Sequence, residues 1–441
     1  MKKILLLFLL FFIIPSSIYA LNEPQTGSPY IALMDLDTGR VLYNKNMYDK
    51  CYPASTTKVM TAILVLENCS PTETCIASYN AVNSVPLGGS NCAIKVGETF
   101  SVSDLMLAMM VASGNEAANI LSEYVETKTG RYFSDLMNDK AKQLGCVNTH
   151  FSNSNGLHND DHYSCAYDMA LIYRYAWKNY DSFQTYVSTL KFSLPTTDKY
   201  TEDDRIFTNT NKLLIPSTSN SAQNYFYEYA TGGKTGYTNQ AKNCLISSAS
   251  KSGFNLVCSV MGSEQDSAGN SWRYIDTKAL FDYGFSDLVK ATIATKGDSA
   301  ITLPVSNAVD DQKNLNLVYS ESLIINLSLA ESLNTFVPEI TLISGDLVAP
   351  IKKGDLIGKA NFNIYNVDYS IDLLADSDIQ EKPKILAMVV TIVLNILKVI
   401  LIIFVILLIV ALAIRTFNMI RHKKRKKQRM QQIRYNARFR R

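Results

Sequence analysis

The feature that most constrains this chain is an apolar segment near its C-terminus, which is followed by a basic end. Residues 385–414 carry one charged residue, Lys398, and exceed the roughly 20 residues that cross a bilayer as a helix. The tail, residues 415–441, holds twelve Lys and Arg and no acidic residue. We predict a transmembrane helix over 385–414 and a cytoplasmic basic tail, because Lys and Arg accumulate on the cytoplasmic side. A helix lying on the membrane surface is the alternative, although no polar face interrupts the run.

The other end of the chain has the pattern of a signal peptide. Lys2 and Lys3 precede an apolar core over residues 4–14, and Pro15 and small residues then lead to Ala20. We predict that residues 1–20 are the signal peptide and that the mature chain begins at Leu21. An uncleaved N-terminal anchor is the alternative. Either reading places the body of the protein outside the cytoplasm. With the signal peptide removed, a single span attaches it to the cell membrane.

The charge of that body differs from the charge of the whole chain, which is +3. Setting aside the tail, Lys2, Lys3 and Lys398 leaves 28 Lys and Arg against 40 Asp and Glu, a net charge near −12. We therefore do not expect the body to bind nucleic acid. Charge alone would allow the tail to do so, but a juxtamembrane anchor explains it more simply.

Cysteine and histidine usage limits the metal chemistry that is available. All eight cysteines lie in the exported body, where an even number permits disulfides without defining their pairing. The chain has only four histidines and no Cys-x-x-Cys motif, so we expect no zinc site and no cofactor. Cys51 lies four residues before Ser55 and is interpreted as structural, because no basic residue at a spacing that we recognise would activate its thiol.

Periodicity predicts two domains in the body. Residues 30–36 and 40–43 flank an Asp37-Thr38-Gly39 turn and indicate a β-hairpin. Helices are expected over 104–112, 116–125, 133–144, 168–177 and 273–283, and strands over 235–237, 244–249 and 255–261. Strands at both ends with helices between them predict one antiparallel sheet packed with a helical cluster, over residues 21–288. Short alternating stretches separated by turn residues predict a small all-β domain over 289–378.

One stretch in the first domain has the sequence pattern of a serine that is activated by a nearby lysine. Pro53-Ala54-Ser55-Thr56-Thr57-Lys58 precedes an apolar run and predicts a helix start with Ser55 and Lys58 on one face. A lysine whose pKa is lowered by burial can take the serine proton, and the positive helix end favours charge at Ser55. An N-capped helix is the alternative, because Ser-x-x-Lys is a common pattern. It recurs at Ser188 to Lys191 and at Ser248 to Lys251.

Two further motifs could supply the partners of this serine. Ser113-Gly114-Asn115 lies between two expected helices, 104–112 and 116–125, where it can point a hydroxyl and an amide into a cleft. A plain turn is the alternative, since Ser78-Tyr79-Asn80 has the same form. Lys234-Thr235-Gly236 lies on a glycine-rich strand, where a substrate backbone can approach and a Lys and a Thr can bind a free carboxylate. A second copy, Lys128-Thr129-Gly130, fits a helix C-terminus instead.

The three motifs, in this order and separated by 58 and 121 residues, resemble those of penicillin-binding proteins and serine β-lactamases. The chain is most similar to the low-molecular-weight D-alanyl-D-alanine carboxypeptidases, whose second motif is also Ser-Gly-Asn. Segments 155–158, 162–163, 168–170, 280–285 and 350–354 look like theirs as well, so the resemblance covers about residues 28–374. The full C-terminal span and the cysteine content depart from the family.

The resemblance implies a fold and a reaction. The fold is a penicillin-binding/β-lactamase-like α/β (α+β) domain, followed by the all-β domain and the membrane helix. The reaction removes the terminal D-alanine from peptidoglycan stem peptides through an acyl-enzyme, and β-lactams acylate the same serine. Ser55 is implied as the nucleophile, Lys58 as its general base and Ser113 as a proton relay to the leaving amine. The backbone N–H groups of Ser55 and Tyr237 are implied as the oxyanion hole.

The same resemblance implies a set of substrate-binding residues. Asn115 would hold the peptide bond of the substrate, and Lys234 and Thr235 would hold its terminal carboxylate. Gly236 and Tyr237 complete the implied set.

Two other functions stay open from the sequence. A β-lactamase would need a deacylating glutamate, which no motif supplies recognisably. A non-catalytic penicillin-binding sensor or wall-binding module is the other alternative, against which the complete motif set argues. His158 and His162 could suggest a histidine-based mechanism, but no Gly-x-Ser-x-Gly motif accompanies them, and loop packing is the favoured interpretation.

Overall fold

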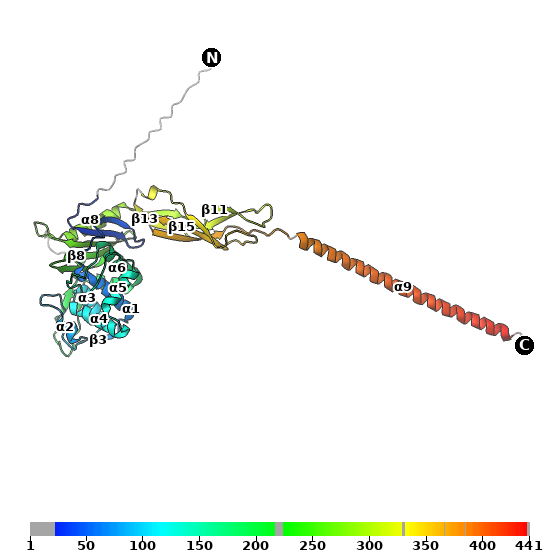
Figure 1. The fold of residues 1–441 in the computed structure, drawn as a ribbon, viewed down its shortest axis with the longest axis horizontal. Coiled ribbons are helices and arrows are strands. Elements are labelled where there is room, and N and C mark those ends of the chain that lie inside the picture. Colours follow the sequence, from blue (N-terminus) through cyan, green and yellow to red (C-terminus); the bar gives the residue numbers. More distant parts are fainter. Residues whose placement is uncertain (1–22, 217–223, 329–330, 366, 384, 439–441) are drawn as a thin grey trace, which may run out of the picture. The chain divides into compact units, whose positions relative to one another are not determined.

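The protein is described by a computed structural model that covers residues 23–216, 224–328, 331–365, 367–383 and 385–438 (Figure 1). The predicted signal peptide, residues 1–20, lies outside the described residues. The described residues form two compact units. The first contains residues up to 295 together with 322–339 and 361–370, and the second contains 296–321, 340–360 and the residues from 371 onward.

A five-stranded antiparallel sheet forms the centre of the first unit. Its order is β2-β1-β9-β8-β7, so strands from the two ends of the domain lie side by side. This confirms the prediction of one antiparallel sheet formed by strands from both ends of the domain. The strands are β1 (Tyr30–Asp35), β2 (Val41–Lys45), β7 (Ala230–Thr238), β8 (Lys242–Lys251) and β9 (Phe254–Ser263).

Both faces of this sheet are covered, as Figure 1 shows for the first unit. Alternate residues of a strand point to opposite faces. Ile31 and Leu33 of β1 therefore pack with Phe281 of α8 (Trp272–Asp287), while Ala32 and Met34 pack with the helical cluster. That cluster contains α1 (Lys58–Asn68), α3 (Val102–Val111), α4 (Asn115–Thr129), α5 (Phe133–Gln143), α6 (Ala166–Asn179) and α7 (Asp181–Ser188).

Short elements complete the first unit. They are α2 (Tyr79–Asn83) and two ribbons, β3 (Thr74–Ile76) with β4 (Thr99–Ser101) and β5 (Lys191–Ser193) with β6 (Ile206–Thr208). Strand β10 (Leu288–Ala294) pairs with β13 (Leu323–Ser328). The sequence analysis did not predict α2, α7 or the two short ribbons.

The start of the first helix differs from the prediction. Residues Ala54–Thr57 form a 3-10 turn, η1, and the α-helix begins only at Lys58. Ala54 has a φ of +47°, which lies outside the α-helical region and prevents a regular helix from starting at Pro53. Ser55 and Lys58 still fall on one side, because a 3-10 turn has three residues per turn.

All eight cysteines of the chain are free thiols. Burial raises the pKa of the Cys51 thiol well above its usual value, so this residue stays protonated and unreactive at neutral pH. Packing, hydrogen bonds and ion pairs such as Arg205–Glu98 hold the first unit together.

A second five-stranded sheet has the order β11-β12-β16-β15-β14. Its strands are β11 (Ser299–Pro304), β12 (Asn314–Tyr319), β14 (Glu339–Leu342), β15 (Leu356–Ile364) and β16 (Val367–Ala375). The predicted all-β character of the region after residue 289 is thereby confirmed.

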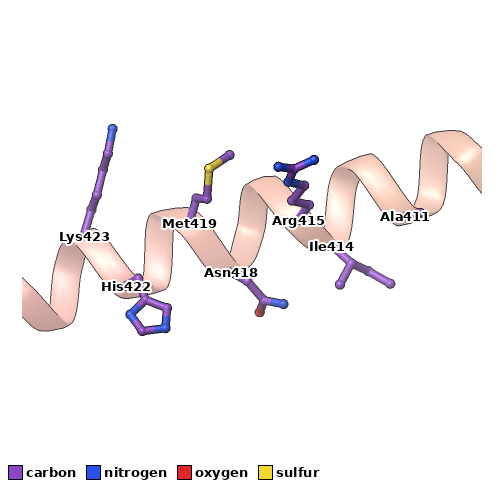
Figure 2. A pocket seen from close by; sticks show the side chains of 7 residues that line it. All are labelled: Ala411, Ile414, Arg415, Asn418, Met419, His422 and Lys423. Carbon is purple, nitrogen blue, oxygen red and sulfur yellow. The ribbon is translucent and has the colours of Figure 1, made fainter.

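The C-terminal residues form one continuous helix, α9 (Ile385–Arg438). Its stretch Met388–Arg434 is long and apolar enough to cross a membrane. Figure 2 shows the point where apolar residues give way to basic ones, with Arg415, Met419 and Lys423 projecting from the helix. The helix thus continues without a break from the predicted span into the basic tail.

Candidate active site

Ser55 and Lys58 face each other at the start of α1. The Lys58 Nζ lies 2.9 Å from the Ser55 Oγ. Two other acceptors surround this amine, the Asn115 Oδ1 at 2.7 Å and the Asn155 carbonyl oxygen at 2.7 Å. Neither of these can donate a proton to it. A neutral Lys58 can therefore donate to both and keep its lone pair for the Ser55 hydroxyl proton.

The surroundings of Lys58 favour that neutral form. The side chain is completely buried, and burial lowers its pKa well below the usual value for lysine. The cation of Lys234 lowers it further, while Glu116 opposes the shift. The lysine is thus poised to act as a base.

The second and third motifs meet at Lys234. Its Nζ donates to the Ser113 Oγ at 3.0 Å and to the Thr235 carbonyl at 2.9 Å. Burial, and then Arg273, lower the pKa of Lys234 to about 7. Ser113 is held at a φ of +63°, a left-handed conformation that costs a non-glycine residue on the order of 1–3 kcal/mol. Such strain is typical of functional turns.

Strand β7 lies unusually close to the serine. A Cβ placed on Gly236 would lie 3.0 Å from the Ala54 Cβ, the Pro53 carbonyl oxygen and the Ser55 backbone nitrogen. Only glycine lets the strand approach in this way. The approach sets residues 235–237 beside Ser55. The Tyr237 side chain remains 60% exposed at the edge of the strand.

These side chains line one cleft of about 800 Å³. Ser55, Ser113, Asn115, Thr235, Gly236 and Tyr237 all line it, whereas Lys58 and Lys234 are buried behind its wall. The structure thus brings together every site residue that the sequence suggested.

Three further contributors were not predicted from the sequence. Arg273 of α8 lines the cleft, and its Nη1 donates to the Gly236 carbonyl at 3.2 Å. Thr210 accepts the hydroxyl of Thr235 at 2.7 Å. The Asn155 carbonyl holds Lys58, as described above. An Asn-Gly pair at 155–156 gave a turn signal, but no local pattern indicated which atoms would face the site.

The two candidate histidines have different environments. His158 lines the cleft and packs edge-on against Tyr52, with ring centroids 4.7 Å apart. His162 is buried, and its Nε2 lies 2.8 Å from the Thr57 Oγ1. Burial lowers the pKa of His162 to about 3. Its role is therefore loop packing, in agreement with the interpretation from sequence.

The repeated copies of the motifs lie away from the cleft. Ser248 is on strand β8 and contacts the Tyr173 hydroxyl at 2.9 Å. Ser188 ends α7, and Ser78 caps α2 through the Ala81 N–H. Gly130 closes α4 in the left-handed conformation, as predicted for the second Lys-Thr-Gly copy.

Comparison with known proteins agrees with this geometry. The family of D-alanyl-D-alanine carboxypeptidases, Peptidase_S11, matches residues 19–265. The D-alanyl-D-alanine carboxypeptidase DacF of Bacillus subtilis is 31% identical over 328 residues, which cover 74% of this chain and 79% of the relative. DacC of Escherichia coli is 27% identical over 351 residues, covering 78% and 82%.

Solved structures give the same result. Penicillin binding protein 5 from Haemophilus influenzae has a TM-score of 0.61 at 26% identity and covers 82% of this chain and 100% of that chain. A peptidoglycan synthesis regulatory factor (PBP3) from Streptococcus pneumoniae has a TM-score of 0.65, and at 20% identity this likeness concerns the fold. It covers 81% of this chain and 100% of that chain. The chain therefore belongs to the D-alanyl-D-alanine carboxypeptidase family, among the low-molecular-weight penicillin-binding proteins.

Proposed function

We propose that Ser55 is the nucleophile of this serine D-Ala-D-Ala carboxypeptidase and that Lys58 is its base. The observation that carries the proposal is the 2.9 Å contact between the Ser55 Oγ and the Nζ of the fully buried Lys58. Lys58 takes the hydroxyl proton as the Ser55 oxygen attacks the carbonyl carbon of the penultimate D-alanine. The Ser55 and Tyr237 N–H groups stabilise the oxyanion.

The leaving group departs on the Ser113 side of the cleft. The bond between carbonyl carbon and nitrogen breaks, and the amine of the terminal D-alanine takes up a proton through Ser113. An ester to Ser55 remains, and water hydrolyses it to release the shortened peptide and free Ser55. A β-lactam follows the same first step, but its leaving amine stays tethered to the acyl group, so the ester persists.

Positive charge at one end of the cleft fits the terminal carboxylate of the substrate. Lys234, Thr235 and Arg273 lie around Gly236 there, and Arg273 has no acidic hydrogen-bond partner among the described residues. Asn115 binds the peptide bond of the substrate. A carboxylate site of this kind favours substrates with a free C-terminal carboxylate.

The β-lactamase alternative is less well supported. Among the described residues that line the cleft there is no Asp or Glu that could activate a deacylating water. We therefore expect slow release of bound penicillin. The alternative of a non-catalytic sensor or wall-binding module does not account for the contact between Ser55 and the buried Lys58.

We further propose that α9 anchors the protein in the cell membrane through residues 385–414, with residues 415–441 in the cytoplasm. The tail would then contact anionic lipid headgroups, because its charges are all positive. The peptidase domain over 21–288 would act on the outer face, with the all-β domain over 289–378 as a spacer. Peptidoglycan stem peptides ending in D-Ala-D-Ala are the substrates.

The test uses the detergent-solubilised full chain and Ser55→Ala. Each protein is incubated with penicillin for intact mass measurement, and D-alanine release from a D-Ala-D-Ala peptide is assayed. We expect a stable adduct and D-alanine release in the wild type, both lost in the variant. An adduct without D-alanine release would favour the sensor, and no adduct would refute Ser55 as the nucleophile.

A further inference from the structure

Residues 84–94, here called the rim loop, form one wall of the cleft. Residue 84 and residues 86–90 line the cleft directly, and the Leu87 side chain at the tip is fully exposed. The loop contains no helix or strand, and Ala93 has a φ of +55°. Its position therefore depends on specific contacts with the elements beneath it.

Those contacts converge on the first turn of α4. The Asn115 N–H donates to the Ser90 carbonyl at 2.9 Å. The next residue, Glu116, accepts the Cys92 N–H through its Oε1. A Cβ on Gly114 would lie 2.9 Å from the Cys92 Sγ, so glycine is needed there for the loop to pack. Three consecutive residues of one turn thus hold the rim loop.

Glu116 is an unusual anchor because it is an ionisable group in the protein interior. Glu116 is only 2% exposed. The Oε2 is buried with no hydrogen-bond partner among the described residues. Glu116 lines a pocket of about 190 Å³, as do Val82, Val85 and Ile94. Cys92 and Ile94 of the rim loop pack in the core, so the Glu116 carboxyl holds the loop at its buried end.

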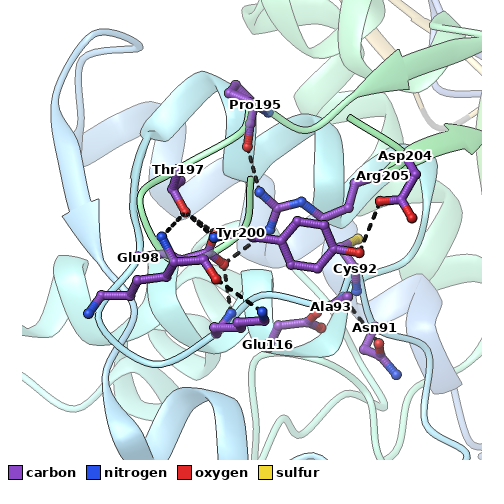
Figure 3. Close-up of polar contacts among 12 residues, drawn as sticks. Asn91, Cys92, Ala93, Glu98, Glu116, Pro195, Thr197, Tyr200, Asp204 and Arg205 are labelled. Atoms are coloured by element: carbon purple, nitrogen blue, oxygen red, sulfur yellow. Dashed lines mark hydrogen bonds and ion pairs between the residues drawn. The ribbon is translucent and has the colours of Figure 1, made fainter. Parts of the chain in front are cut away.

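Burial raises the pKa of Glu116, while the backbone N–H groups of Cys92 and Ile94 act in the opposite direction. Burying a carboxyl is costly when one of its oxygens lacks a hydrogen-bond partner, as the Oε2 does among the described residues. Figure 3 shows Glu116 beside Cys92 and, close by, a second buried glutamate, Glu98, which pairs with Arg205.

We propose that Glu116 is a positioning residue, which holds the rim loop through the Cys92 N–H and thereby fixes Asn115 against Lys58. Asn115 is the link, since its N–H binds the loop and its Oδ1 accepts the Lys58 Nζ at 2.7 Å. Releasing the loop would move the cleft wall and the amide that orients the base together. The proposal rests on the proposed function of Ser55 and Lys58.

Glu98 offers a matched control. It is fully buried, accepts the Lys95 N–H at 2.7 Å and pairs with Arg205 at 3.0 Å. It makes no hydrogen bond to residues 84–94 that the structure records. Its loss should therefore cost stability without releasing the rim loop.

The experiment compares Glu116→Ala, Glu116→Gln and Glu98→Ala in the full chain. The second-order rate of penicillin acylation should fall about 10- to 100-fold in Glu116→Ala, since small misplacements of catalytic groups have effects of this size. Glu116→Gln should stay within about threefold of wild type, because its amide oxygen can still accept the Cys92 N–H. Glu98→Ala should keep the acylation rate within about twofold although its thermal midpoint falls.

Amide hydrogen exchange provides a readout that does not depend on activity. The Cys92 amide should exchange faster in Glu116→Ala and at the wild-type rate in Glu98→Ala. Unchanged exchange in Glu116→Ala would overturn the proposal even if the wild type did not react with penicillin. Equal slowing of acylation in Glu116→Gln and Glu116→Ala, or in Glu98→Ala, would also overturn it.

Discussion

At the scale of single residues, the proposed mechanism requires different protonation states of two lysines buried behind the cleft wall. In it, Lys58 is neutral to accept the Ser55 proton, whereas Lys234 is charged to bind a carboxylate. Burial lowers the pKa of both, that of Lys234 to about 7. Activity should therefore rise as pH increases through the pKa of Lys58 and fall as Lys234 loses its proton.

The measurement is the pH dependence of penicillin acylation for wild type and Lys234→Arg. Arginine keeps its charge at alkaline pH. The falling alkaline limb should be absent in Lys234→Arg, even if its maximal rate is lower. The same alkaline limb in both proteins would show that another group controls it.

A second residue-scale prediction concerns stability in acid. The Nδ1 of His162 accepts the Ser152 N–H at 3.0 Å, so protonation there would place two donors against each other. The pKa of His162 is about 3 in the folded state, below its usual value of 6.5. Between these values the unfolded state binds a proton that the folded state does not, so stability falls as pH decreases, by up to about 1.4 kcal/mol per pH unit.

This dependence can be checked by the thermal midpoint between about pH 6.5 and pH 4. His162→Asn should lose less stability over this range than wild type. His158→Asn, which removes a histidine of the same loop at the cleft, should behave like wild type. Parallel curves for wild type and His162→Asn would contradict the assignment.

At the scale of elements, the sequence predicted those parts whose signals are local. The β1–β2 hairpin, the terminal strands and α5 followed from alternation, turn residues and helix-ending glycines. The β5–β6 ribbon did not, because its strands have three residues each and depend on the buried Arg205–Glu98 pair across 107 residues. Arg273 was also missed because its contact is with a residue far away in the sequence. Only the packing of α8 brings it to Gly236.

The approach of β7 to η1 gives an element-scale prediction. In Gly236→Ala the new methyl group would meet backbone atoms of residues 53 and 55 at 3.0 Å, so the strand must move by a few tenths of an ångström. We expect acylation to slow by about 100-fold, because the carboxylate site and the nucleophile separate. Penicillin acylation and thermal midpoint are measured together.

The control for this substitution is Gly345→Ala. A Cβ at Gly345 meets nothing within 4 Å. This variant should acylate at the wild-type rate. If Gly236→Ala also acylated at that rate, the close approach of β7 would not be required for catalysis.

At the scale of the whole molecule, charge separates the chain into two parts of opposite sign. The net charge of the body is near −12, and the tail carries twelve positive charges. Moving that tail across a bilayer is unfavourable, so the charges favour one orientation of α9. A soluble product is expected when the chain is ended at Pro383, before the helix begins.

Topology can be tested with an epitope tag placed after Arg441 in cells whose wall has been removed. Trypsin cleaves after Lys and Arg, so a tail on the outer face would be destroyed, whereas a cytoplasmic tail is protected. We expect trypsin to degrade the body in intact cells and to leave a tagged membrane fragment, which disappears once the cells are lysed. Loss of the tag in intact cells would place the tail outside. Recovery of the full chain in the soluble fraction would exclude α9 as the anchor altogether.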